Sequence, residues 1–270
     1  MYSDKQFFIL KAKLAVHWGL VSRIVPYSKS RRVLKLPPPT TLIGALTYPF
    51  AYYKRVPENI TITLSSANKF KGMIISAHAS LASPASIYGD INRVYWYHKA
   101  RKQAKTDAVA LEKLYLTPSE DQEHPILNVI YIIDPEVAKN LIGFWWSETL
   151  EALAWSITRI GQRESIVSTL DVKSKLTRPE SINTIETTYY LPLNVVERVE
   201  SGEYTLQEYV PPIVEIGEYS DVEKIPYIIP FSFIESKPST VNVRLKSNAL
   251  VLRIDSDSVV FDSGWVKRES

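Results

Sequence analysis

Residues 6–46 read QFFILKAKLAVHWGLVSRIVPYSKSRRVLKLPPPTTLIGAL, and this stretch decides the fold. It begins with apolar side chains at every second position from Phe8, with Lys11 and Lys13 between them. A period of two places the apolar residues on one face of a strand and the lysines on the other. The pattern predicts a half-buried strand over 6–16 with a basic outer face.

The end of the same stretch predicts a helix. The prolines at 37–39 cannot continue a strand ladder, because proline has no N–H to donate. Thr40 or Thr41 then provides an N-cap for a helix over about 42–48, which Pro49 kinks or ends. The residues between the strand and the prolines have no clear period and predict a long basic loop.

The rest of the first 172 residues continues this alternation of strands and helices. Periodicity and cap residues predict strands over 60–66, 72–82, 125–133 and 164–172 and a helix over 147–161 that starts at Ser147. Residues 91–116 are aromatic, then basic, then weakly helical, and predict an excursion from the core. The order is that of an α+β, ferredoxin-like or RRM-like β-α-β-β-α-β domain.

Residues 173–270 predict a second, mostly β region. Strands are expected over 185–196, 208–216, 225–235, 240–254 and 258–262, and helical patterns are scarce. The predicted division is therefore a mixed domain over 1–172 and a β-rich region over 173–270.

Composition excludes several classes of site. The chain has no cysteine, so disulfides, thiolate zinc sites and cysteine nucleophiles are excluded, as suits a cytoplasmic protein. No apolar stretch is long enough to span a membrane, and the N-terminus lacks the apolar core of a signal peptide. No GK[ST] loop or GxGxxG motif occurs, and the four histidines lack metal-ligand spacing, so neither cofactor nor metal is expected.

Charge is distributed unevenly along the chain. Residues 1–57 carry ten lysines and arginines but one acidic residue, whereas residues 180–235 carry two basic and eleven acidic residues. A one-signed basic surface favours a polyanion, because each cation that neutralises a phosphate releases counterions. The basic end therefore predicts contact with nucleic acid, and the acidic region predicts a protein neighbour, with ordinary solvated surfaces as the alternative.

The basic loop and the predicted helix start fit a phosphate together. Arg31, Arg32 and Lys35 provide cations, Thr40 and Thr41 add hydroxyl donors, and the N–H groups of a helix N-terminus favour an anion. Gly44 allows close approach of the backbone. The alternative is that the threonines only cap the helix and Gly44 only permits packing.

Aromatic residues are interleaved with cations in two places: His17 and Trp18 with Arg23, and Tyr95-Trp96-Tyr97-His98 with Lys99, Arg101, Lys102 and Lys105. Bases stack on aromatic faces while cations follow the backbone, so this mixture suits single-stranded RNA. The alternative for each tryptophan is core packing. The cluster Tyr95, Tyr97, His98 and Lys99 also holds the residue types of a metal-independent ribonuclease.

Two segments resemble a known family. WGLVSRIVPYSKSRRVLKLPPPTTLIGAL at 18–46 is similar to the N-terminal signature of the fifth CRISPR-associated protein family, the RAMP-type subunits of type I Cascade complexes. RIGQRESIVS at 159–168 resembles the second signature of that family. The form PPPTTLIGAL is most like the archaeal I-A subtype.

The resemblance implies a ferredoxin-like domain with a protruding β-hairpin thumb, which would map to about 88–116. Such subunits bind the repeat-derived 5′ handle of the crRNA, cap the filament of Cascade backbone subunits and contact the large subunit, and through the complex they meet target DNA. The implied handle surface comprises His17, Trp18, Arg23, Lys29, Arg31, Arg32, Lys35, Thr40, Thr41 and Arg163. The I-C branch instead cleaves precursor crRNA with Tyr, His and Lys, which have no matching positions here.

The sequence therefore predicts a non-catalytic RNA-binding scaffold for antiviral defence, with Tyr97, Lys99, Arg101, Lys102 and Lys105 as further RNA contacts. The main alternative is a metal-independent endoribonuclease that processes precursor crRNA. A third hypothesis is an interaction module whose basic face binds an acidic protein.

Overall fold

A computed structural model describes residues 5–22, 33–61, 64–213, 215–217 and 222–266. Its centre is an antiparallel sheet of four strands in the order β2-β5-β1-β6. The strands are β1 (Phe7–Val16), β2 (Ile74–Leu81), β5 (Ile126–Ile133) and β6 (Val167–Thr177). β1 lies in the middle, where Ala12 is paired with Val129 on one side and Val172 on the other.

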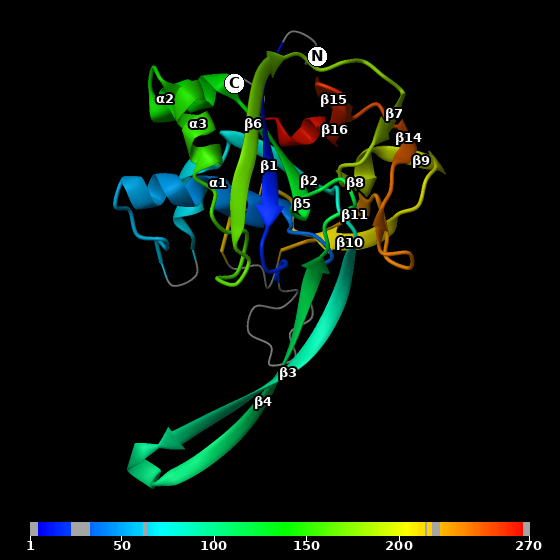
Figure 1. Cartoon of the computed structure of the whole chain (residues 1–270). Helices are drawn as coiled ribbons and strands as arrows, with labels where there is room; N and C mark the ends of the chain where they lie inside the picture. The colour runs from blue at the N-terminus through cyan, green and yellow to red at the C-terminus, as the bar shows by residue number, and fades with distance from the viewer. Residues whose placement is uncertain (1–4, 23–32, 62–63, 214, 218–221, 267–270) are drawn as a thin grey trace.

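Helices pack on one face of this sheet (Figure 1). They are α1 (Pro39–Tyr53), α2 (Pro135–Ile142) and α3 (Trp146–Trp155), with a short 3₁₀ turn η1 (Ser66–Phe70) after α1. α1 packs against β2, and α3 against β1 and β6. The ring of Trp146 meets Phe8 edge-on, with ring centroids 4.8 Å apart.

The second face of the sheet is covered by the C-terminal half of the chain. Phe7 on that face contacts Phe261, with ring centroids 5.6 Å apart, and Lys11 forms an ion pair with Asp257 at 2.6 Å. Phe7 and Ile9 are as deeply buried as the alternate residues of β1. The predicted strand is confirmed, but its basic outer face is wrong, because a second layer covers most of it.

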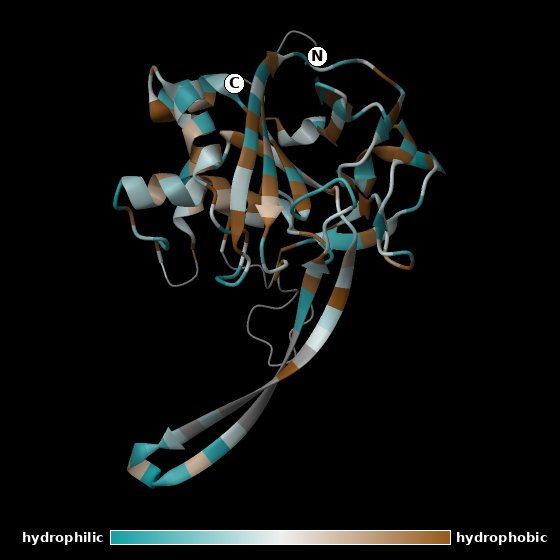
Figure 2. Ribbon diagram, in the orientation of Figure 1, coloured by the Kyte–Doolittle hydropathy of each residue, from teal (hydrophilic) through white to brown (hydrophobic). Residues whose placement is uncertain are grey.

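A long two-stranded ribbon is inserted between β2 and β5. β3 (Ala85–His98) and β4 (Gln103–Leu116) pair along their whole length and join through a short 3₁₀ turn, η2 (Lys99–Arg101). Figure 1 shows the ribbon projecting from the body, and Figure 2 shows hydrophilic residues at its tip. The excursion predicted for 91–116 is confirmed, but its weakly helical part is wrong, because these residues form β4.

Residues 184–262 are built mainly of short strands, as predicted, but residues 210–213 of the strand expected over 208–216 form no strand. The strands are β7 (Thr184–Thr187), β8 (Leu191–Pro192), β9 (Val196–Ser201), β10 (Thr205–Tyr209), β11 (Ile225–Ile229), β12 (Phe231–Ser232), β13 (Lys237–Pro238), β14 (Val241–Leu245), β15 (Ala249–Ile254) and β16 (Asp257–Asp262), with 3₁₀ turns η3 (Leu193–Val195) and η4 (Ser263–Trp265). They form small sheets in the orders β10-β11-β8, β7-β14-β9, β12-β13 and β15-β16.

One hydrophobic cluster joins both parts of the chain, and a second lies wholly within the C-terminal region. Tyr190, Tyr209 and Tyr227 from the C-terminal half belong to the same buried cluster as the central sheet. The predicted domain limit at 172 falls inside β6. The division into two domains stays a prediction.

Several predicted limits need correction. No strand forms at 64–66, where a turn and η1 follow α1, and the segment α2 was not predicted. α1 extends from 39 to 53 through Pro49, whereas α3 ends at 155 instead of 161. The N-cap of α3 is Trp145 rather than Ser147, which lies within the helix. In the described part of the chain, no helix is long and apolar enough to cross a membrane.

Candidate nucleic-acid interface

The two segments that carry the family resemblance meet in the folded chain. The backbone N–H of His17 donates to the carbonyl of Ile166 at 3.0 Å, and that of Val21 donates to Ser165 Oγ at 2.8 Å. Val21 also forms a parallel bridge with Gly161. Residues about 145 positions apart in the sequence therefore form one surface beside α1.

Two glycines make this junction possible. Gly19 has φ +84°, and a Cβ there would lie 2.4 Å from the carbonyl oxygen of Leu114. Gly161 also has φ +84°, and its Cβ would lie 3.0 Å from the carbonyl oxygen of Val21. An L side chain is disfavoured in this left-handed region. Leu20 and Leu114 exchange two backbone hydrogen bonds, at 2.8 and 3.0 Å, so the turn is fixed to the base of the ribbon.

The start of α1 lies next to this junction. Its N-cap is Pro38, which makes no side-chain cap bond, so the predicted capping role of Thr40 and Thr41 is wrong. Thr40 is buried in the first turn, and Thr41 is partly exposed. Thr41 remains near the junction, since its Cγ2 lies 3.4 Å from the position of a Gly161 Cβ.

Buried tyrosines of the C-terminal half hold the chain that leads into α1. Tyr209 Oη donates to the carbonyl of Leu36 at 3.0 Å, and Tyr190 Oη donates to that of Pro37 at 3.2 Å. Burial raises the pKa of both phenols above the ordinary value, so they stay protonated as donors. The direction in which the chain enters α1 is therefore fixed by residues far away in the sequence.

Lys35 is less available than the sequence suggested. Its Nζ donates to Thr205 Oγ1 and lies 4.9 Å from the ring centroid of Phe233, and burial lowers its pKa. These contacts give Lys35 a structural role in addition to its predicted RNA contact.

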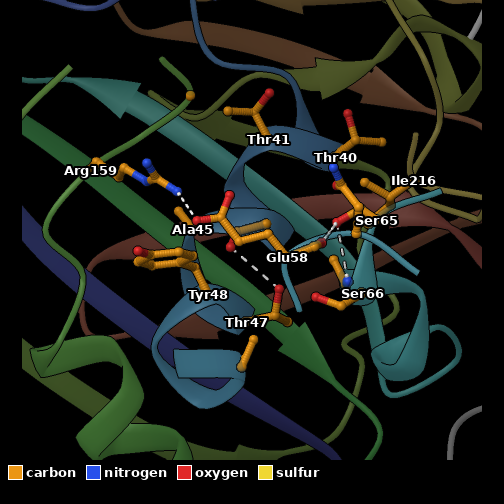
Figure 3. A pocket seen from close by; sticks show the side chains of 15 residues that line it. Thr40, Thr41, Ala45, Thr47, Tyr48, Glu58, Ser65, Ser66, Arg159 and Ile216 are labelled. Carbon is orange, nitrogen blue, oxygen red and sulfur yellow. Dashed lines mark hydrogen bonds and ion pairs between the residues drawn. The ribbon is translucent and has the colours of Figure 1, made fainter. Parts of the chain in front are cut away.

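A cavity of about 250 Å³ opens beside the start of α1 (Figure 3). It is lined by Thr40, Thr41, Gly44, Ala45, Thr47, Tyr48, Ala51, Glu58, Asn59, Ser65, Ser66, Ala67, Arg159, Gly161 and Ile216. One wall is a stack in which the guanidinium of Arg159 lies 4.2 Å from the ring centroid of Tyr48. Arg159 Nη2 also donates to Glu58 Oε1 at 3.2 Å, so a planar cation, an aromatic ring and a carboxylate line one hollow.

Tyr48 and Glu58 were not predicted as site residues from the sequence. Arg159 is the first residue of the second signature, and this is the sequence feature that could have marked it as a site residue. Its position near the end of the predicted helix over 147–161 gave no other indication. Nothing in the local pattern of Tyr48 or Glu58 distinguishes them from other residues of a helix and a loop.

His17 and Trp18 lie at the end of β1. His17 Nε2 and Ser168 Oγ are 2.7 Å apart, and the ring of His17 lies 6.0 Å from that of His124. Trp18 is 64% exposed, so the core-packing alternative is wrong for this tryptophan. Arg163, in the second signature, is also exposed.

The other predicted RNA contacts lie at the tip of the ribbon, away from the body (Figure 1). Tyr95 and Tyr97 share one face of β3 and are 74% and 61% exposed. Lys99, Arg101, Lys102 and Lys105 are exposed around the turn. The ring Nδ1 of His98 accepts the N–H of Arg101 at 3.2 Å, which gives His98 a capping role in the turn.

The predicted contacts therefore form two groups, one beside α1 and one at the tip. Arg23, Lys29, Arg31 and Arg32 lie outside the described residues, as does the side chain of Trp96. Within the described ranges, no three histidine, aspartate or glutamate side chains gather as metal ligands would.

Comparisons with known proteins define the class. No family model matches the chain. A crystal structure of a CRISPR protein from Archaeoglobus fulgidus superimposes with a TM-score of 0.61 at 18% identity, over 94% of this chain and 99% of that one. The fold is thus the mixed fold of a CRISPR protein, with few helices and many strands.

Two curated proteins of Saccharolobus solfataricus are similar in sequence. "CRISPR system aCascade subunit Cas5 1" is 33% identical over 200 residues, which cover 72% of this chain and 77% of the relative. "CRISPR-associated protein Cas5 3" is 29% identical over 196 residues, with the same coverage. The chain belongs to the Cas5 family of CRISPR-associated proteins, which confirms the family predicted from the two signatures.

Proposed function

We propose that this chain is a non-catalytic RNA-binding subunit of a type I Cascade complex of the I-A kind. It binds the repeat-derived 5′ handle of the crRNA and caps the filament of backbone subunits. The observation that carries this proposal is the meeting of both signatures beside α1, at a cavity lined by Arg159 and Tyr48. The relative named as an aCascade subunit supports membership of such a complex.

The fold supports a more specific assignment. In a ferredoxin-like unit, two β-α-β halves interleave so that the fourth strand lies beside the first. Reading β1, β2, β5 and β6 as its four strands, the sheet order β2-β5-β1-β6 fits that arrangement. The ribbon β3–β4, inserted between the second and third of these strands, would be the thumb.

The distribution of side chains suggests how RNA is held. Exposed cations at the ribbon tip suit the sugar-phosphate backbone, while Tyr95 and Tyr97 offer faces on which unpaired bases stack. Trp18 offers another face at the base of the ribbon. The RNA would then run between the tip and the start of α1, with phosphates setting its path and bases setting its identity.

The acidic region suits a protein neighbour. Among its described residues, nine glutamates are exposed, namely Glu180, Glu186, Glu197, Glu200, Glu203, Glu208, Glu215, Glu223 and Glu235. Such a surface repels RNA and attracts a basic partner. The backbone subunit and the large subunit of Cascade are the neighbours we propose, and target DNA is reached through the complex.

The test is filter binding of the full chain to crRNA with and without its 5′ handle, in chelator and across a salt series. Handle-dependent binding of intact RNA supports the proposal. Replacing Lys99, Arg101 and Lys102 by alanine should reduce the slope of log K against log salt by about 0.7 per lost phosphate contact. Equal binding of both RNAs by the wild-type chain would contradict handle recognition.

The same samples, run on a gel, test the endoribonuclease alternative. Cleavage of repeat RNA in chelator that is lost in His98→Ala would favour the nuclease, whereas intact RNA favours the scaffold. A His98→Asn variant is the matched control, because an amide oxygen can still accept the N–H of Arg101 and preserve the turn.

A further inference from the structure

Gly44 has no packing role within the described chain. It lies in the middle of α1, where glycine is a poorer helix former than every residue except proline. A Cβ built on Gly44 meets nothing within 4 Å. From the sequence, Gly44 could either allow a phosphate to approach the backbone or permit close packing within the fold. The structure removes the packing explanation. The space over Gly44 is the cavity itself, which this glycine lines.

The cavity combines groups that suit a planar polar ligand. The guanidinium carbon of Arg159 lies 4.2 Å from the ring centroid of Tyr48, and the Arg159 side chain is 28% exposed. Arg159 holds Oε1 of Glu58, and Oε2 is the second acceptor of that carboxylate. Figure 3 shows Arg159 and Tyr48 on one side, Ser65 and Ser66 on the other, and Glu58 between them, with its carboxylate on Arg159 and its carbonyl accepting the N–H of Ser66.

We propose that the cavity takes one unpaired nucleobase of the bound RNA, and that this base carries an exocyclic amino group. The proposal rests on the RNA-binding function proposed above and assigns base recognition within it to this cavity. The base lies against the guanidinium of Arg159, as unpaired bases do on arginine planes. Its amino group donates to Glu58, because a carboxylate accepts N–H but repels the carbonyl oxygens of uracil. Gly44 leaves room for the ring.

The experiment uses the full chain and a set of crRNAs in which each handle nucleotide in turn is made abasic. Removing the base that occupies the cavity should weaken binding about tenfold, and abasic changes elsewhere should have smaller effects. Replacing the same base by uracil should also weaken binding, but by less than removal, because the donor to Glu58 is lost while the ring still lies against Arg159. These measurements identify the position, and the variants below assign it to the cavity.

Gly44→Leu places a larger side chain in the cavity from the helix, at a position where a Cβ meets nothing within 4 Å. This variant should bind intact crRNA about tenfold more weakly than wild type and should no longer respond to the abasic change. Glu58→Gln should shrink the penalty for uracil, because an amide can donate to its carbonyl. Gly44→Ala is the matched control for the helix backbone, since it adds only one methyl group, and thermal melting checks that each variant is folded.

The outcomes separate this inference from the function on which it rests. Three results would overturn the cavity assignment alone while binding remains handle-dependent. They are that no abasic position weakens binding, that the effect of the abasic change persists in Gly44→Leu, or that uracil is the preferred base. Loss of handle dependence in wild type would overturn the proposed function as well.

Discussion

Two buried tyrosines that differ by one hydrogen bond provide a direct test of how the start of α1 is held. Tyr209 and Tyr227 are almost fully buried, and their ring centroids lie 5.3 Å apart. Tyr209 Oη donates to the carbonyl of Leu36 at 3.0 Å, whereas Tyr227 Oη has no partner in the described part of the chain. Replacing each tyrosine by phenylalanine removes one buried hydroxyl oxygen, which is hydrogen-bonded at Tyr209 and has no partner at Tyr227.

The two substitutions should change the free energy of unfolding differently. Tyr209→Phe loses a buried hydrogen bond and leaves the carbonyl of buried Leu36 unsatisfied, which costs about 1–2 kcal/mol of the free energy of unfolding. Tyr227→Phe removes a buried hydroxyl that has already lost its water without compensation, so stability should stay equal or rise by up to about 1 kcal/mol. The two variants should therefore differ by about 2 kcal/mol.

Urea unfolding followed by circular dichroism measures this difference, and thermal melting gives a second measure. For a chain of this size, each kcal/mol shifts Tm by about 2–4 °C, so Tyr209→Phe should melt about 2–8 °C below wild type. Equal destabilisation by both substitutions would refute the reasoning, because the ring packing and not the hydrogen bond would then carry the effect.

Three further predictions concern the rest of the fold. Gly44→Ala should stabilise the chain by about 1 kcal/mol in urea unfolding, because alanine is the better helix former and its Cβ meets no neighbour; a loss of stability would mean that α1 is packed differently. Gly19→Ala should lower stability by about 2 kcal/mol or more, from a left-handed φ and a Cβ 2.4 Å from the carbonyl of Leu114, and a melting temperature equal to that of wild type would contradict this. Burial lowers the pKa of His78 to about 4 from its ordinary 6.5. The unfolded chain therefore binds a proton as pH falls below about 6.5 while the folded chain does not, and the free energy of unfolding should fall by about 2 kcal/mol between about pH 7.5 and pH 5. A His78→Gln variant should lack this part of the pH dependence, and an unchanged pH profile would show that His78 does not cause it.

Local patterns predicted the elements whose signal is contained in a few neighbouring residues. The strands predicted from the alternation in β1 and from the apolar run in β5 are confirmed, because the apolar residues of each pattern are the ones that become buried. The pattern could not reveal that β1 is covered on both faces, since Lys11 reads as solvent-facing until Asp257 is known to lie opposite. Residues 91–116 were recognised as an excursion, but the part that forms β4 was predicted to be weakly helical because the alanine and lysine content of 99–116 favours a helix in isolation. Pairing with β3 overrode that propensity.

The candidate site was predicted in part. Residues of both signatures were named, and Trp18, Arg163 and the cations of the ribbon tip are exposed as an RNA contact requires. The two threonines were given the wrong role, because the helix begins earlier, at Pro39. Lys35 was predicted as a phosphate contact, and its contacts with Thr205 and Phe233 could not be predicted because those residues are about 170 positions or more away in the sequence.

By itself, the sequence determined the family, the α+β character and the uneven distribution of charge along the chain, because signatures, periodicity and charge are properties of the chain before it folds. Only the tertiary structure decided that residues 17–22 and 159–166 form one surface, that Tyr190 and Tyr209 hold the entry to α1, and that Gly44 faces a cavity. Each of these is a contact between segments far apart in the sequence. Such contacts depend on how β1, β5 and β6 pair and which layers cover them, and no local pattern of residues contains that information.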